Sequence, residues 1–109
     1  MEKRRAERVP VHIRVLYRSE TLTFEGWAKN LSRNGLFMRS DFLDHEGVKA
    51  EIEVRVPGSE EILSLAGRVV RVDTSPTTAG MAIRFTKLTT PVRRALANLV
   101  IERSCMATA

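Results

Sequence analysis

The chain has 109 residues, 43% of them hydrophobic, which is enough for one domain with one core and too little for two. Its formal net charge of +5 comes mainly from arginine, with 14 arginines against 4 lysines, and this bias favours the recognition of phosphates or carboxylates. No apolar run approaches the roughly 20 residues of a membrane span, the N-terminus is charged where a signal peptide needs an apolar segment, and the single cysteine excludes an internal disulfide. We therefore expect a cytoplasmic, soluble protein.

Residues 1–8 form a basic segment without apolar periodicity, and they include Lys3, Arg4, Arg5 and Arg8. The spacing Arg4-x-x-x-Arg8 offers paired guanidinium groups, which match a phosphate or the O6/N7 edge of guanine and can stack on a base. A solvated, mobile terminal arm is the ordinary interpretation of such a charge cluster. We predict a flexible arm over 1–8 and one folded domain over 9–105.

Alternation of apolar and polar residues with a period of two predicts six strands. They are expected at about 9–18, 22–28, 36–38, 51–56, 62–72 and 81–85. Asn34-Gly35 is a strong hairpin signal between the second and third strands. The segment 62–72 has apolar residues on both faces, which predicts a central strand.

After Lys87 the period changes to that of a helix, which we expect over about 90–104. Its apolar positions follow the spacing i, i+3, i+4, i+7 and i+8, namely Val92, Ala95, Leu96, Leu99 and Val100. Thr90 is the expected N-cap, and Pro91 suits the first helical position. The predicted fold class is mainly β: a six-stranded antiparallel barrel with one C-terminal helix that plugs an opening.

The segment Asn30-x-Ser32-x-x-Gly35 lies where the second and third strands meet. It offers a side-chain amide, a hydroxyl, and a glycine that allows a ligand to approach the backbone. The same residues are also ordinary turn chemistry, in which side chains satisfy local N–H groups. On its own, this segment leaves both interpretations open.

Together, the two motifs resemble those of the PilZ family of bacterial receptors for cyclic di-GMP. That family has an Arg-x-x-x-Arg before its first strand and an Asp/Asn-x-Ser-x-x-Gly between its second and third strands. The resemblance covers almost the whole chain, because Gly67–Arg71 is similar to the family's Gly-Arg-Val-Val-Arg strand and Gly80–Phe85 is similar to its last strand.

The resemblance implies a receptor that binds cyclic di-GMP without a cofactor, a metal or a catalytic step. Arg4 and Arg8 would hold guanine and phosphate groups, and Arg5 would assist. Asn30, Ser32 and Gly35 would line the other side of the ligand. The resemblance also implies that the residue before the arginine motif, here Lys3, influences whether one or two ligands bind, so the stoichiometry stays open.

Other functions fit these residues less well. His45 lies near Asp41, Asp44 and Glu46, but acidic turns are commonly just solvated, so a metal site is disfavoured. A nucleic-acid-binding barrel is supported by the basic charge, yet no aromatic residue adjoins the N-terminal arginines in sequence. Trp27 is out of phase with the apolar face of its strand, so it is either a surface contact or packed under the helix, and we expect the packing. A PilZ-like module that binds only proteins is the other alternative.

The resemblance also implies an unknown downstream protein partner. Motility is one output known for the family, and it comes here only by analogy. The oligomeric state, a homodimer included, stays open.

Overall fold

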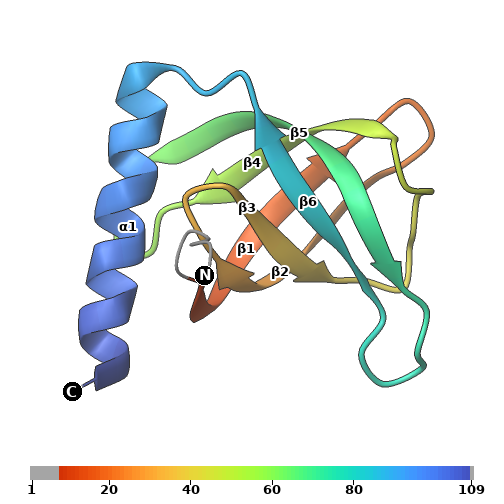
Figure 1. Ribbon diagram of the computed structural model, residues 1–109, viewed down its shortest axis with the longest axis horizontal. Helices are drawn as coiled ribbons and strands as arrows, with labels where there is room; N and C mark the ends of the chain where they lie inside the picture. Colours follow the sequence, from red (N-terminus) through yellow and green to blue (C-terminus); the bar gives the residue numbers. More distant parts are fainter. Residues whose placement is uncertain (1–7, 109) are drawn as a thin grey trace, which may run out of the picture.

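The computed structural model describes residues 8–108 and shows six antiparallel strands closed into a barrel, with one helix beside it (Figure 1). Around the barrel, the strands follow the order β1-β2-β3-β6-β5-β4, so that β1 pairs with both β2 and β4. The elements are β1 (Val9–Arg18), β2 (Thr23–Leu31), β3 (Gly35–Arg39), β4 (Lys49–Arg55), β5 (Ile62–Asp73), β6 (Gly80–Thr86) and α1 (Thr90–Thr108). The predicted mainly-β barrel with one C-terminal helix is confirmed.

The inward side chains of all six strands form one apolar core. Its fully buried members include Tyr17, Ile52 and Met81. Helix α1 packs across the end of the barrel where β1 begins and β2 ends, and it contributes the buried Leu96 and Leu99 to the core (Figure 1). Within residues 8–108, no helix is both long and apolar enough to cross a membrane.

The pairing of β2 with both of its neighbours is irregular at Lys29. On the β1 edge, Asn30 pairs with Pro10 but Ala28 pairs with Ile13, so the register shifts between these two pairs. In β3, adjacent residues pair with Ala28 and Asn30, which leaves Lys29 without a partner. Such bulges re-aim side chains and are frequent next to binding sites. The bulge at Lys29 therefore sets which residues of β2 face outward near the Asn30 motif.

Strand β5 is paired on both edges, but only one of its faces is buried. Leu63, Leu65 and Val69 face the core, whereas Ile62 and Val70 are 44% and 46% exposed. The prediction of a central strand agrees with its pairing to both β4 and β6, and its outward apolar residues are exposed because a barrel covered by one helix leaves the outer face of every strand to solvent. Trp27 also lies on the outer face, 39% exposed, so the prediction that it packs under the helix is wrong.

Helix α1 begins at Thr90 as predicted, but its N-cap differs from the prediction by one residue. The Thr89 Oγ1 accepts a hydrogen bond from the Val92 N–H at 3.4 Å, and the Thr89 carbonyl accepts one from the Arg93 N–H at 2.8 Å. These contacts make Thr89 the N-cap in place of Thr90. Pro91 then occupies the second helical position, where an N–H would still have no partner within the helix.

Candidate ligand-binding site

The structure joins the two sequence motifs at one point. The Arg8 Nη1 donates a hydrogen bond to the Asn30 Oδ1 at 3.3 Å, although the two residues are 22 positions apart. The contact is exposed, and it connects the residue before β1 to the end of β2, two strand ends that lie beside α1 in Figure 1. Arg4, Arg5 and the rest of the segment 1–7 lie outside the described residues. The structure therefore shows the final residue of the arginine motif beside the first residue of the Asn-x-Ser-x-x-Gly motif.

Ser32 holds the turn between β2 and β3. Its Oγ accepts hydrogen bonds from the N–H groups of Asn34 and Gly35 at 3.1 and 3.2 Å, and the side chain is 5% exposed. Its own N–H donates to the Gly35 carbonyl at 2.9 Å. The turn chemistry that the sequence suggested is therefore present, and it fixes the shape of this motif before any ligand arrives.

Gly35 is needed because the backbones of β3 and β6 approach closely. A Cβ at this position would overlap the carbonyl oxygen of Ile83. Among the described residues, positive φ angles occur at Gly47, Gly58 and Lys87, so Asn34-Gly35 does not form the turn with two positive φ angles that such a pair commonly indicates. The glycine therefore serves strand packing here.

An outward-facing cluster on β1 and β2 adjoins this point, and it consists of His12, Arg14, Trp27 and Lys29. The rings of His12 and Trp27 stack with their centroids 4.1 Å apart and 3° between their planes. The Arg14 guanidinium carbon lies 5.4 Å from the Trp27 ring centroid. The fold thus places aromatic rings on the same two strands as the Arg8–Asn30 contact, although none adjoins the arginines in sequence.

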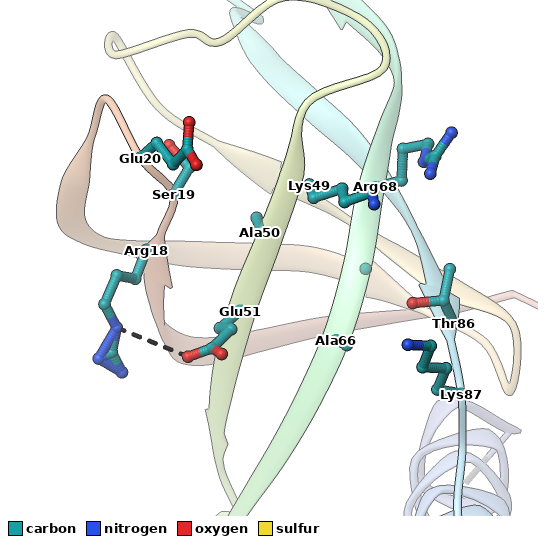
Figure 2. A pocket seen from close by; sticks show the side chains of 11 residues that line it. Arg18, Ser19, Glu20, Lys49, Ala50, Glu51, Ala66, Arg68, Thr86 and Lys87 are labelled. Atoms are coloured by element: carbon teal, nitrogen blue, oxygen red, sulfur yellow. Dashed lines mark ion pairs between the residues drawn. The ribbon is translucent and has the colours of Figure 1, made fainter.

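A separate open hollow of about 530 Å³ lies over β4 and β5 (Figure 2). Its lining includes Lys49, Arg68 and Lys87, together with the acidic Glu20 and Glu51. These residues come from a region of the barrel that does not include the Arg8–Asn30 contact. The hollow lies apart from both sequence motifs, so we do not assign the ligand to it.

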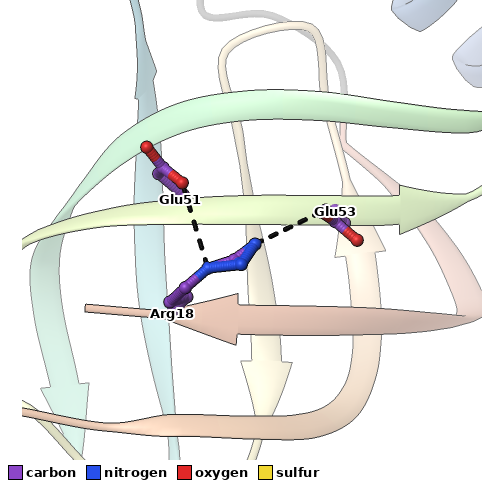
Figure 3. A network of polar contacts seen from close by, with 3 residues as sticks. All are labelled: Arg18, Glu51 and Glu53. Carbon is purple, nitrogen blue, oxygen red and sulfur yellow. Dashed lines mark hydrogen bonds and ion pairs between the residues drawn. The ribbon is translucent and has the colours of Figure 1, made fainter.

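Arg18, at the edge of that hollow, is held by two carboxylates on β4 (Figure 3). Its Nη2 lies 3.2 Å from the Glu53 Oε2, and its Nε lies 3.9 Å from the Glu51 Oε1. Among the described residues, the Nε is buried without a hydrogen-bond partner. The charge of Arg18 is thus balanced within the barrel wall.

Asp44, which the sequence suggested to be a solvated turn residue, is buried at the end of the barrel opposite α1. Its carboxylate accepts hydrogen bonds from the hydroxyl groups of Tyr17, Ser19 and Thr21, each at 2.6 Å. Burial raises the pKa of Asp44, but the hydrogen bonds from Ser19, Thr21 and Tyr17 outweigh this effect and hold its pKa below the ordinary value. Within the described residues, no group of acidic, histidine or cysteine side chains could hold a metal ion. Asp44 therefore fastens the loop 40–48 to the barrel.

The family model described as PilZ domain matches residues 2–102. The chain belongs to the PilZ domain family. PilZ domains are ligand-binding or effector domains rather than enzymes. No curated protein matches the sequence.

Several solved structures share this fold. The chain superposes on the Bacillus subtilis inhibitor of motility MotI/DgrA with a TM-score of 0.81 at 17% identity, covering 96% of this chain and 53% of that one. For the PilZ domain of YcgR from Escherichia coli with c-di-GMP, the TM-score is 0.78 at 15% identity, with 97% and 95% covered. For YcgR in complex with c-di-GMP, it is 0.80 at 20% identity, with 98% and 48% covered. The chain thus spans about half the length of MotI/DgrA and of this YcgR chain.

Proposed function

We propose that this PilZ domain is a receptor for cyclic di-GMP. The observation that carries the proposal is the hydrogen bond from Arg8 to Asn30, which brings the ends of the two motifs within 3.3 Å of each other. Structural neighbours of the same fold are complexes with c-di-GMP. The proposal for this chain is therefore supported by both the family and the local geometry.

The side chains suit the chemistry of the ligand. Cyclic di-GMP carries two phosphate charges, and Arg4 and Arg8 would neutralise them with charge-assisted hydrogen bonds while their flat faces stack on guanine. Arg5 would assist. The Asn30 side chain would accept a hydrogen bond from a guanine edge, beside the preformed turn of Ser32 and Gly35. Binding in this scheme needs no cofactor and no bond-breaking step.

We further propose that the ligand acts by ordering residues 1–8. Four basic side chains in this segment repel one another, and a dianion would supply the compensating charge. The arm, once held against the barrel, would form a surface that a downstream protein recognises. Signalling to such a partner in the cytoplasm, and any role of a homodimer, are part of this proposal.

Calorimetry with purified protein tests the binding proposal. We expect saturable binding of cyclic di-GMP that GMP does not reproduce. Arg8→Ala should lose most of the affinity, because a hydrogen bond to a charged group contributes about 1.5–3 kcal/mol. The melting temperature should change little, since Arg8 is exposed. Arg55→Ala, which removes an exposed arginine of β4, is the matched control and should bind like the wild type.

Two outcomes would overturn the proposal. A flat titration with folded protein would favour a module that binds only proteins. Binding of a short oligonucleotide in place of cyclic di-GMP, with affinity falling steeply between two salt concentrations, would favour a nucleic-acid-binding barrel. If Arg8→Ala keeps its affinity but melts many degrees lower, Arg8 has a structural role.

A further inference from the structure

We propose that Trp27 is a stacking platform for one guanine base of the ligand, so that the site extends from Asn30 along the outer face of β2. This inference rests on the proposed function, and it assigns a specificity-determining residue that neither sequence motif contains. Four observations support it: the bulge at Lys29, the exposure of Trp27, its contacts with β1, and the cations around it.

The bulge places Trp27 and Asn30 on the same face. In a regular strand, residues three positions apart point to opposite sides of the sheet. Here the extra residue Lys29 changes the phase, so that Ala28 and Leu31 both face the core while Trp27 and Asn30 both face outward. Three residues of strand span about 10 Å, which is within the reach of a dinucleotide held at Asn30.

The indole is exposed but already held in place. Trp27 is 39% exposed, yet His12 stacks against it at 4.1 Å and Arg14 lies 5.4 Å from its ring centroid. The Lys29 Nζ lies 3.5 Å from the His12 Nδ1. A ring that is fixed in advance loses little conformational entropy when a ligand stacks on it.

The ring-stacking and cation contacts of Trp27 among the described residues come from β1, so in this proposal the ligand approaches from the β3 side. On that side, its cross-strand neighbour is the exposed Arg39. Among the described residues, Arg39 makes no ion pair and no contact over an aromatic ring. A guanidinium there is available to a phosphate between two bases.

Phe37 of β3 lies on the same outer surface as Arg39 and is closer to Asn30. It pairs with Asn30 across the strands, and the Arg71 guanidinium carbon lies 5.8 Å from its ring centroid. Aromatic rings interleaved with arginines suit alternating bases and phosphates. This alternation, joined to the Arg8–Asn30 contact, favours a nucleotide over the surface of a protein partner as the occupant.

Fluorescence offers a direct test, because Trp27 is the only tryptophan in the chain. Titration with cyclic di-GMP should quench the emission of the wild-type protein, with a Kd equal to that from calorimetry. Calorimetry should show a loss of affinity of about 10-fold or more for Trp27→Leu, the range that loss of one base–aromatic stack predicts. Trp27→Phe should retain part of the affinity. Phe42→Leu, which removes an exposed aromatic from the loop after β3, should bind like the wild type.

The two proposals fail in different ways. If the wild-type protein binds cyclic di-GMP by calorimetry, but its tryptophan emission does not change and Trp27→Leu binds equally well, the stacking platform is wrong and the receptor assignment stands. If wild-type calorimetry is flat, both proposals are overturned. Should Trp27→Leu fail to fold, Trp27→Phe and the wild-type quenching still decide the question.

Discussion

At the scale of single residues, the buried Asp44 shows how polar contacts hold a loop of this fold in place. Three hydroxyl groups donate to its buried carboxylate, from Tyr17 in β1 and from Ser19 and Thr21 in the following turn. Burial, followed by the hydrogen bond with Asp44, raises the pKa of Tyr17, so this phenol stays protonated and donating throughout the neutral range. The network fastens the loop 40–48 over the end of the barrel opposite α1.

Asp44→Asn should lower the free energy of unfolding by about 2–4 kcal/mol, because an amide cannot accept all three hydrogen bonds and one of its atoms is a donor. Denaturant unfolding at pH 7 measures this loss. Asp41→Asn changes an exposed carboxylate three residues away and should stay within about 0.5 kcal/mol of the wild type. Equal stability of all three proteins would contradict a structural role for Asp44.

The same variant has a defined pH dependence. The pKa of Asp44 is lower in the folded protein than in the unfolded chain, so its ionised form stabilises the fold above the ordinary aspartate value of about 3.9. This stabilisation is lost as the pH falls through the lowered pKa of the folded state. The gap in stability between wild type and Asp44→Asn should therefore be full near pH 6 and shrink in acid. If the difference in unfolding free energy between the two proteins instead grew below pH 4, the pKa of Asp44 would be raised by folding and not lowered.

These residues also show which features the sequence conceals. Asp44 looked like a solvated turn acid because its partners Tyr17, Ser19 and Thr21 lie more than 20 positions away in the chain. The outward position of Trp27 does follow from its being out of phase with the apolar face of its strand. Its neighbour His12, however, belongs to another strand, and pairing register cannot be read from periodicity.

At the scale of elements, periodicity predicted every strand and the helix, but not the irregular positions between them. Alternation predicts which face of a strand is apolar. It does not show that both β1–β2 and β2–β3 lose register around Lys29, because a bulge depends on which strands become neighbours. Alternation likewise does not show that the apolar residues on the outer face of β5 stay exposed, since this follows from closure of the barrel.

The N-terminus of α1 gives a test with a built-in control. Thr89→Ala should destabilise the protein by about 1 kcal/mol, since it removes the hydroxyl that accepts the Val92 N–H. Thr90→Ala alters the next residue, which is exposed and already within the helix, and should change stability by less than about 0.5 kcal/mol. Thermal or denaturant unfolding of the pair measures the difference. A larger loss for Thr90→Ala would restore Thr90 as the cap.

At the scale of the whole molecule, the barrel has two dissimilar ends. One end carries the loop 40–48, which Asp44 fastens to β1. The other end carries α1 (Figure 1), and there the Arg8–Asn30 contact joins the start of β1 to the end of β2, next to the turn at Ser32. Both motifs were recognisable from the sequence, and the strand order explains why they meet: β1 begins where β2 ends. The proposed platform at Trp27 depends on the bulge, so the sequence alone could not place Trp27 on the same face as Asn30.

The proposed switch predicts where ligand binding changes protection from amide hydrogen exchange. The turn from Ser32 to Gly35 is already hydrogen-bonded, and the core face of α1 is already buried, so neither has much order to gain. The segment 1–8 combines four basic side chains with no apolar periodicity, so a dianion should change it most. On addition of cyclic di-GMP, protection should rise most from the arm through about Val11, rise modestly around Ser32, and stay unchanged from Val92 to Val100. An arm that is protected equally without ligand would contradict the switch while leaving the binding site intact, because affinity requires only that Arg4 and Arg8 reach the ligand.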